Sequence, residues 1–270
     1  MSANSGLMAG KRGLVMGVAN DHSIAWGIAK ALREQGAELA FTYQGEAFGK
    51  RVRPLAGSLG SNLVLPCDVE DDSDIERVFT EIDKAWGSMD FLVHAIAYSD
   101  KEELKGRYLN TTRRNFARTL AISCYSFTAL AKQAQPLMRN GGSLVTLSYL
   151  GAERVTPNYN VMGVAKAALE ASVRYLSADL GPQGVRVNAI SAGPMRTLAG
   201  SAIADARFVY RWNQQHAPLR RNVLLEEVGA AGLYLLSDLS SAVTGEVHYV
   251  DGGYNLVGIP SPARMVDGET

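Results

Sequence analysis

The stretch GLVMGVANDHSIAWG, residues 13–27, decides the fold. It opens with an apolar run, turns at Gly17 and Ala19, and continues from Ser23 with an amphipathic pattern. A buried strand, a tight turn and a helix begin a βαβ unit, and small residues in the turn let the backbone approach a pyrophosphate. The free N–H groups at the start of the helix attract anions, and the Ser23 hydroxyl can join them.

The same stretch has a second interpretation. Gly27 is expected to let the helix pack closely on the strand, as in dinucleotide-binding units. The three-glycine fingerprint of those units is incomplete here, so a tight strand–helix turn without a ligand remains an alternative.

Along the rest of the chain, apolar strand-like runs alternate with longer amphipathic runs. The predicted strands are residues 13–19, 38–43, 62–66, 91–97, 143–148, 185–191 and 247–250. The predicted helices are residues 23–35, 45–59, 71–86, 112–139, 158–180 and 225–236. This alternation predicts an α/β fold, a single domain with a doubly wound parallel sheet of about seven strands and helices on both faces.

One segment interrupts the alternation. Residues 198–215 are small and apolar at first and then aromatic, which predicts a helical lid at about residues 197–216 over a ligand site. Residues 1–10 and 257–270 are expected to be flexible tails around a domain of residues 11–256.

Composition restricts the function classes. The chain has 270 residues, is 47% hydrophobic, and balances 27 basic against 27 acidic residues. Zero net charge argues against nucleic acid and membrane surfaces as partners, although an acidic partner could dock on a local basic patch. No apolar run reaches the ~20 residues of a membrane span, and the N-terminus does not resemble a signal peptide.

Cysteine and histidine usage predicts no metal site. Cys67 and Cys124 are too few for a disulfide framework or a zinc motif, and they fit the reducing cytoplasm as structural residues better than as catalytic thiols. The histidines are scattered and are interpreted as structural or surface residues: His22, His94, His216 and His248.

The end of the second predicted strand bears on the cofactor. An acid there binds the ribose of NAD, and an arginine suits the 2′-phosphate of NADP. Gln44 is neutral and can bind ribose, while Lys50 and Arg51 come later, so NADH is expected rather than NADPH. Asp68, after the third strand, can accept a hydrogen bond from the adenine amino group, or it can cap a helix.

Tyr159 and Lys166 lie seven positions apart in one predicted helix, so their side chains share a face. A positive charge beside a phenol favours the phenolate, which predicts a lowered pKa for Tyr159. Such a phenol can donate a hydrogen bond or a proton to an oxygen that becomes negative. The alternative is a tyrosine packed in the core and a lysine in solvent.

The glycine turn, Asp68, the Tyr159/Lys166 helix and NAISAGP at residues 188–194 together resemble the short-chain dehydrogenase/reductase superfamily. Its usual members place the tyrosine and lysine four positions apart. The spacing of seven, with SYLGAE at residues 148–153 before it, is similar to the bacterial NADH-dependent enoyl-[acyl-carrier-protein] reductases over about residues 10–255. This resemblance implies a Rossmann-like fold.

The resemblance also implies a reaction. NADH would reduce the trans-2 double bond of an enoyl thioester on acyl-carrier protein, the last step of the bacterial fatty-acid elongation cycle. Tyr159 would hydrogen-bond the thioester oxygen, and Lys166 would bind the nicotinamide ribose. Tyr149 would line the acyl pocket and assist proton handling, or it is only a packing aromatic. A homotetramer with contacts near residues 225–236 and 245–253 is implied as well.

The resemblance assigns residues to both ligands. The cofactor-binding residues would be Gly17, Ser23, Ile24, Gln44, Asp68, Val69, Ala95, Lys166, Met195 and Thr197. The substrate-binding residues would be Ala97, Tyr149, Tyr159, Met162, Ala199 and Ile203.

The chain departs from the family pattern at two positions. Ala97 stands where glycine is usual, and its methyl group is expected to weaken the binding of diphenyl-ether inhibitors while catalysis is retained. Ala206 stands where an aromatic residue is common in the lid, which leaves chain-length preference and lid geometry open; Phe208 could compensate.

Two other functions remain as alternatives. A carbonyl (3-oxoacyl) reductase of the same superfamily would share the fold, but the spacing of seven and Tyr149 argue against it. A nucleotide-binding scaffold without turnover is a non-enzyme alternative, and the intact Tyr159/Lys166 pair argues against that.

Overall fold

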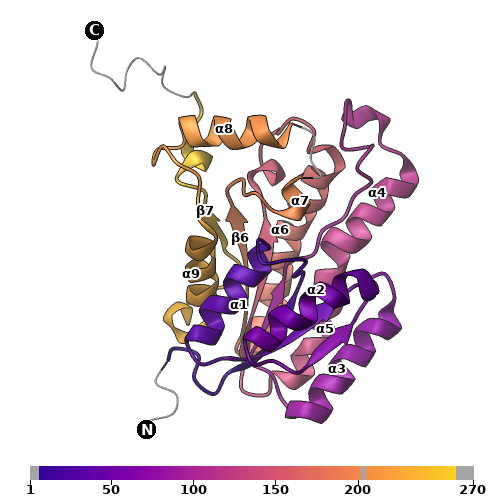
Figure 1. The fold of residues 1–270 in the computed structure, drawn as a ribbon, viewed down its shortest axis with the longest axis vertical. Coiled ribbons are helices and arrows are strands. Elements are labelled where there is room, and N and C mark those ends of the chain that lie inside the picture. Colours follow the sequence, from indigo (N-terminus) through magenta and orange to yellow (C-terminus); the bar gives the residue numbers. More distant parts are fainter. Residues whose placement is uncertain (1–5, 202–204, 260–270) are drawn as a thin grey trace.

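The computed structural model describes residues 6–201 and 205–259, apart from the side chains of residues 199 and 201. Seven parallel strands form one sheet in the order β3-β2-β1-β4-β5-β6-β7. Helices surround this sheet (Figure 1). The strands are β1 (Arg12–Met16), β2 (Glu38–Tyr43), β3 (Val64–Pro66), β4 (Phe91–His94), β5 (Gly142–Ser148), β6 (Val185–Ala192) and β7 (Val247–Val250). The winding direction reverses between β1 and β4, so the predicted doubly wound parallel sheet is confirmed.

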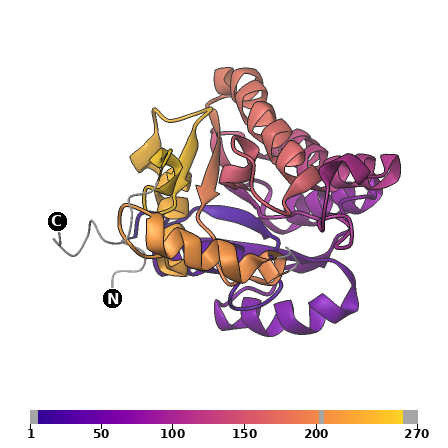
Figure 2. The same ribbon diagram turned by 90° about the horizontal axis from the view of Figure 1, so that it is seen from above.

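Helices cover both faces of the sheet (Figure 2). One face carries α1 (Ile24–Glu34), α2 (Gly45–Ser58) and α9 (Leu225–Leu236). The other carries α3 (Asp72–Trp86), α5 (Ser126–Ala134) and α6 (Asn160–Leu180). Each face of the sheet and its helices enclose a hydrophobic core. Successive strand residues alternate between these two cores, since Val15 belongs to the first and Leu14 to the second. Among the described residues, no helix could cross a membrane.

Helices α1 and α9 meet at a glycine contact. A Cβ on Gly27 would lie 2.6 Å from Cγ of Leu225, and a Cβ on Gly229 would lie 2.6 Å from the carbonyl oxygen of Gly27. Larger side chains would separate the helices. Gly27 therefore permits helix–helix packing, and the predicted contact with the strand is wrong.

The helix predicted at residues 112–139 is interrupted. It consists of α4 (Arg113–Leu120), a π-helical turn (Ala121–Tyr125), α5 and a 3₁₀ turn (Gln135–Leu137). The π turn contacts the loop after β4, because Ser123 Oγ accepts a hydrogen bond from the Tyr98 amide at 3.0 Å and lies 3.1 Å from the Tyr98 carbonyl oxygen. π turns of this kind are frequent at functional sites.

Other boundaries also differ from the prediction. β1 ends at Met16 because Gly17 (φ +98°) turns the chain out of the sheet, and β4 ends at His94. Residues 6–10, expected in a flexible tail, pack on the domain: Met8 is buried and its amide donates to the Gln35 carbonyl at 2.9 Å. Residues 1–5 and 260–270 of the predicted tails lie outside the described residues.

Candidate active site

The predicted cofactor-binding residues gather where the strands end. Gly17 directly follows β1, Gln44 follows β2, Asp68 comes two residues after β3, and Ala95 follows β4. Carboxyl ends of parallel strands share one edge of the sheet, so these residues line a single edge. A Cβ on Gly17 would overlap the Ala95 carbonyl, so β1 and β4 approach closely at the point where the winding reverses.

The turn after β1 leaves an anion site at the start of α1. Ser23 Oγ accepts hydrogen bonds from the amides of Ala19 at 3.0 Å and Asn20 at 3.1 Å. Ser23 therefore shapes the turn, a role that the sequence did not predict. Its side chain does not cap α1, and the first turn of α1 holds no acidic residue. The Trp26 amide donates to the Ser23 carbonyl at 2.9 Å, and the helix start before it is of the kind that attracts a dinucleotide pyrophosphate.

Gln44 and Asp68 form a pair at the neighbouring strand ends. Gln44 Nε2 donates to Asp68 Oδ2 at 3.0 Å. The helix-cap alternative for Asp68 is wrong, because Asp71 caps α3 by accepting from the Ser73 amide. Arg53 on α2 is bound to Glu46 at 2.8 Å. A 2′-phosphate beside Gln44 would meet the Asp68 carboxylate, so this corner fits an unphosphorylated ribose better.

The loop after β6 leads into the predicted lid. Thr197 Oγ1 accepts from the Gly200 amide at 3.0 Å at the start of α7 (Leu198–Ser201). The Arg196 guanidinium lies 4.8 Å from the ring centre of Tyr210 on α8 (Ala206–His216). The two lid helices are therefore fixed to the strand end.

The contacts described in the lid do not cover every residue predicted there. Phe208 is 56% exposed and its ring packs on Trp212, so it does not replace an inward aromatic at Ala206. The side chain of Ala199 is not described, and Ile203 lies outside the described residues.

Tyr159 lies in a small apolar cluster at the start of α6. It is 6% exposed and meets Tyr149 edge to face, with ring centres 5.0 Å apart at 69°. Met162 and Leu104 belong to the same cluster. The predicted substrate-binding residues Tyr149, Tyr159 and Met162 are thus brought together, whereas Ala97 is exposed in the loop after β4.

Two asparagines flank Tyr159 in the left-handed region, Asn158 at φ +58° and Asn160 at φ +43°. Asn160 Nδ2 donates to the Glu103 carbonyl at 3.1 Å, and Asn158 Nδ2 donates to Asp205 Oδ2 at 2.9 Å. Tyr159 is therefore tied to the β4–α4 loop and to the start of α8. The asparagines were missed, although their tolerance of positive φ was a usable sequence signal.

Burial controls the ionisation of both central residues. Lys166 is 6% exposed and Nζ donates to the Leu147 carbonyl at 2.6 Å. Burial lowers the pKa of Lys166 to about 8. Burial raises the pKa of Tyr159, and Tyr149 and Glu170 add to the rise. The predicted lowering of the Tyr159 pKa is wrong, because loss of solvent raises it and Lys166 is not among the charges that act on it.

Tyr159 therefore stays a neutral phenol. A neutral hydroxyl held in a low-dielectric cluster is a fixed hydrogen-bond donor for an oxygen that gains negative charge. Tyr149 is similar, since burial raises its pKa to about 12.

His94 is a structural histidine, as expected. Its ring nitrogens contact Thr146 Oγ1 at 2.8 Å and Ser126 Oγ at 2.9 Å. Burial, followed by the charge of Lys166, lowers its pKa to about 3. No group of three or more metal-ligating side chains occurs in the described part of the chain.

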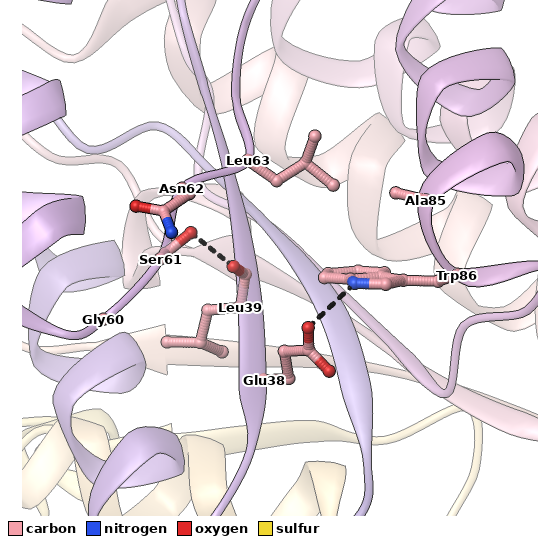
Figure 3. Close-up of a pocket in the computed structure, with 8 residues that line it drawn as sticks. All are labelled: Glu38, Leu39, Gly60, Ser61, Asn62, Leu63, Ala85 and Trp86. Atoms are coloured by element: carbon pink, nitrogen blue, oxygen red, sulfur yellow. Dashed lines mark hydrogen bonds between the residues drawn. The ribbon is translucent and has the colours of Figure 1, made fainter.

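Two cavities differ in their relation to this site. One, of about 280 Å³, lies at the opposite ends of the strands, beside the first residues of β2 (Figure 3). Its polar groups bind one another, as Trp86 Nε1 donates to Glu38 Oε1 at 3.0 Å. The other, of about 400 Å³, is bordered by Tyr159, Gly163 and Tyr108. Only the second cavity adjoins the candidate active site.

Comparison with known proteins adds independent information. The family model described as enoyl-(acyl carrier protein) reductase matches residues 17–255. Enoyl-[acyl-carrier-protein] reductase [NADH] 2 of Rhizobium meliloti is 65% identical over 95% of this chain and 96% of that protein.

Solved structures are similar over nearly the whole chain. An enoyl-(acyl-carrier-protein) reductase from Anaplasma phagocytophilum in complex with NAD has 59% identity and a TM-score of 0.92, covering 97% of this chain and 100% of that one. The Bacillus cereus enoyl-acyl carrier protein reductase with NADP⁺ and indole naphthyridinone has 49% identity and a TM-score of 0.92, covering 94% and 100%.

Proposed function

Because this chain belongs to the enoyl-(acyl carrier protein) reductase family, we propose that it reduces the trans-2 double bond of enoyl-[acyl-carrier-protein] thioesters with NADH. This is the last step of the elongation cycle in fatty-acid synthesis. The observation that carries the proposal is the buried, neutral Tyr159 against Tyr149, with Lys166 two turns along α6.

The residues at the strand ends would hold NADH. The pyrophosphate would lie on the N–H groups of α1, over the turn shaped by Gly17 and Ser23. Gln44 would bind the adenosine ribose and Asp68 the adenine amino group. The remaining contacts in this proposal come from Ile24, Val69, Ala95, Lys166, Met195 and Thr197. NADH supplies the hydride for the β-carbon of the enoyl chain.

The residues of α6 would stabilise the charge that develops on the substrate. As the thioester carbonyl becomes an enolate, the Tyr159 hydroxyl donates a hydrogen bond to its oxygen. Because its pKa is raised, Tyr159 keeps its proton at neutral pH, so the proton that the α-carbon takes up to complete the reduction would come from solvent. Lys166, with one N–H fixed to the Leu147 carbonyl, holds the nicotinamide ribose and adds positive charge.

The acyl chain would lie in the apolar cluster around Tyr149 and Met162. Ala97, in the loop after β4, would also border this proposed pocket. The lid at about residues 197–216 would cover it, and the acyl-carrier protein would bring the chain to it.

We also propose a homotetramer in the cytoplasm. Tyr125 is 57% and Tyr175 is 77% exposed along the seam between the π turn and α6, an apolar surface that a second copy could cover. β7 is an edge strand and could form a second contact with another copy. Two different self-complementary surfaces generate a tetramer.

The unpaired thiols of Cys67 and Cys124 fit a reducing compartment.

Replacing Tyr159 by phenylalanine tests the proposal. Tyr159→Phe removes only the hydroxyl, so NADH binding followed by fluorescence should change less than about threefold, while kcat falls about 10²- to 10³-fold. Tyr234→Phe, the same change on α9, is the control and should keep full activity. A Tyr159→Phe enzyme with kcat near that of the unchanged protein would refute the role of the phenol.

A further inference from the structure

Glu170 is a buried carboxyl group that the reaction steps above do not use. It lies one helical turn beyond Lys166 on α6 and is 5% exposed. A buried acid is costly unless hydrogen bonds and opposite charges compensate for the lost water. Glu170 has such a partner, because the Ser148 hydroxyl donates a hydrogen bond to Oε1.

Ser148 lies in the chain between Leu147 and Tyr149, the residues that contact the two central residues of the site. Three consecutive residues at the end of β5 each contact α6 or the residue before it. The Leu147 carbonyl accepts from Lys166, the Ser148 hydroxyl donates to Glu170, and the Tyr149 ring packs on Tyr159. Glu170 therefore supplies the middle of three contacts that join this strand end to the helix.

Charge links Glu170 to Lys166 as well. Burial lowers the pKa of Lys166, while Cys124 and Glu170 oppose the lowering. His94 also faces Lys166 but is uncharged at neutral pH, since its own pKa is about 3. Of these three neighbours of Lys166, Glu170 is the one with a carboxyl group, so it can supply a negative charge beside the ammonium.

The surroundings of Glu170 act in both directions. The pKa of Glu170 is raised, mainly by burial and also by Glu153, although the hydrogen bond from Ser148 and the charges of Arg174 and Lys166 oppose the rise. Tyr249 on β7 also faces this group. The Ser148 hydroxyl is placed to donate a hydrogen bond to the Glu170 carboxylate.

We propose that Glu170 is a positioning residue for the reduction: its carboxylate is the buried counter-charge that keeps Lys166 protonated, and its hydrogen bond with Ser148 holds the end of β5 against α6. The inference rests on the proposed function, because that function gives Lys166 its role. The inference predicts that removing the charge of Glu170 and removing its hydrogen bond with Ser148 have different effects on kcat.

The test is the pH dependence of kcat from pH 6 to 10, with melting temperatures measured in parallel. The unchanged enzyme should lose activity above a pH of about 8, as Lys166 loses its proton. Glu170→Gln keeps an acceptor for Ser148 but removes the charge, so this basic limb should move down by at least about 0.5 pH unit. Ser148→Ala should lower kcat at every pH and leave the limb in place.

Glu34→Gln on α1, exposed and remote, controls for the change in net charge and should change neither quantity. Glu170→Asp keeps the charge and should keep the limb, which preserves the test if Glu170→Gln does not fold. A limb unmoved in a folded Glu170→Gln, or displaced equally in Glu170→Asp, overturns the inference. The proposed function is judged separately, from Tyr159→Phe at pH 7.

Discussion

At the scale of single residues, burial controls the ionisation of His94. Its ring is fully buried against Thr146 and Ser126, and its pKa is lowered from 6.5 to about 3. As pH falls through 6.5, the unfolded chain takes up a proton that the folded protein does not. The free energy of unfolding therefore decreases between pH 6.5 and 3 on account of this residue.

Replacing His94 by glutamine should flatten this acid dependence. Glutamine also offers a donor and an acceptor but does not titrate, so between pH 6.5 and 4 the variant should lose about 3 kcal/mol less stability than the unchanged protein. Urea unfolding at several pH values measures the slopes. His22→Gln, at an exposed position, is the control, and equal slopes for all three proteins would contradict the assignment.

The sequence could predict that Tyr159 and Lys166 share one face, because helical spacing is local. It could not predict the direction of the Tyr159 pKa. That direction depends on solvent exclusion by Leu104, Tyr149 and Met162, which the fold brings to the phenol. Likewise, the bond between Gln44 and Asp68 joins two strand ends and leaves no local signal.

At the scale of elements, the start of α6 is coupled to the lid. Asn158 Nδ2 donates to Asp205 Oδ2, and Asn158 Oδ1 accepts from the Gly106 amide at 3.3 Å. Asp205 is the residue before α8, so the two helix starts meet beside Tyr159.

Asn158→Asp would place two carboxylates against each other and weaken this contact. We expect KM for the enoyl thioester to rise about tenfold, with NADH affinity unchanged, because a lost charge-assisted hydrogen bond is worth about 1.5 kcal/mol. The double variant Asn158→Asp/Asp205→Asn restores a donor and an acceptor in reversed order. Steady-state kinetics should show recovery in the double variant, and a KM as high as that of Asn158→Asp would contradict the coupling.

The strands and most helices could be predicted because each has its own periodicity and turn residues. The π-helical turn could not, since it accompanies a contact between Ser123 and Tyr98, 25 positions apart in the chain. Helix α6 begins two residues later than predicted because Asn158 takes the left-handed conformation, which the apolar pattern does not encode.

At the scale of the whole molecule, exposed aromatic residues predict assembly. Tyr125 and Tyr175 flank the contact between Cys124 and Ser172, whose Sγ and Oγ atoms are 3.5 Å apart. We expect light scattering to give a mass four times that of the chain. Tyr175→Glu should produce a smaller species, because a buried unpaired charge would destabilise the interface.

Leu7→Glu, at an exposed apolar position elsewhere, is the control for that experiment and should not change the mass. A monomer before any substitution would contradict the assembly. The apolar helix at residues 225–236 is expected at subunit contacts, and its face around Gly229 packs on α1 within the same chain. Sequence hydrophobicity alone does not distinguish these two ways of covering an apolar helix.

The most direct test of the central claim is the loss of nicotinamide absorbance with purified protein, NADH or NADPH, and a trans-2-enoyl thioester on acyl-carrier protein, beside a 3-oxoacyl thioester. The proposed function predicts oxidation of NADH with the enoyl substrate and little with the 3-oxoacyl substrate or with NADPH. Turnover only with the 3-oxoacyl substrate would identify a carbonyl reductase. No turnover with either substrate would contradict the catalytic role of Tyr159 and favour a nucleotide-binding scaffold.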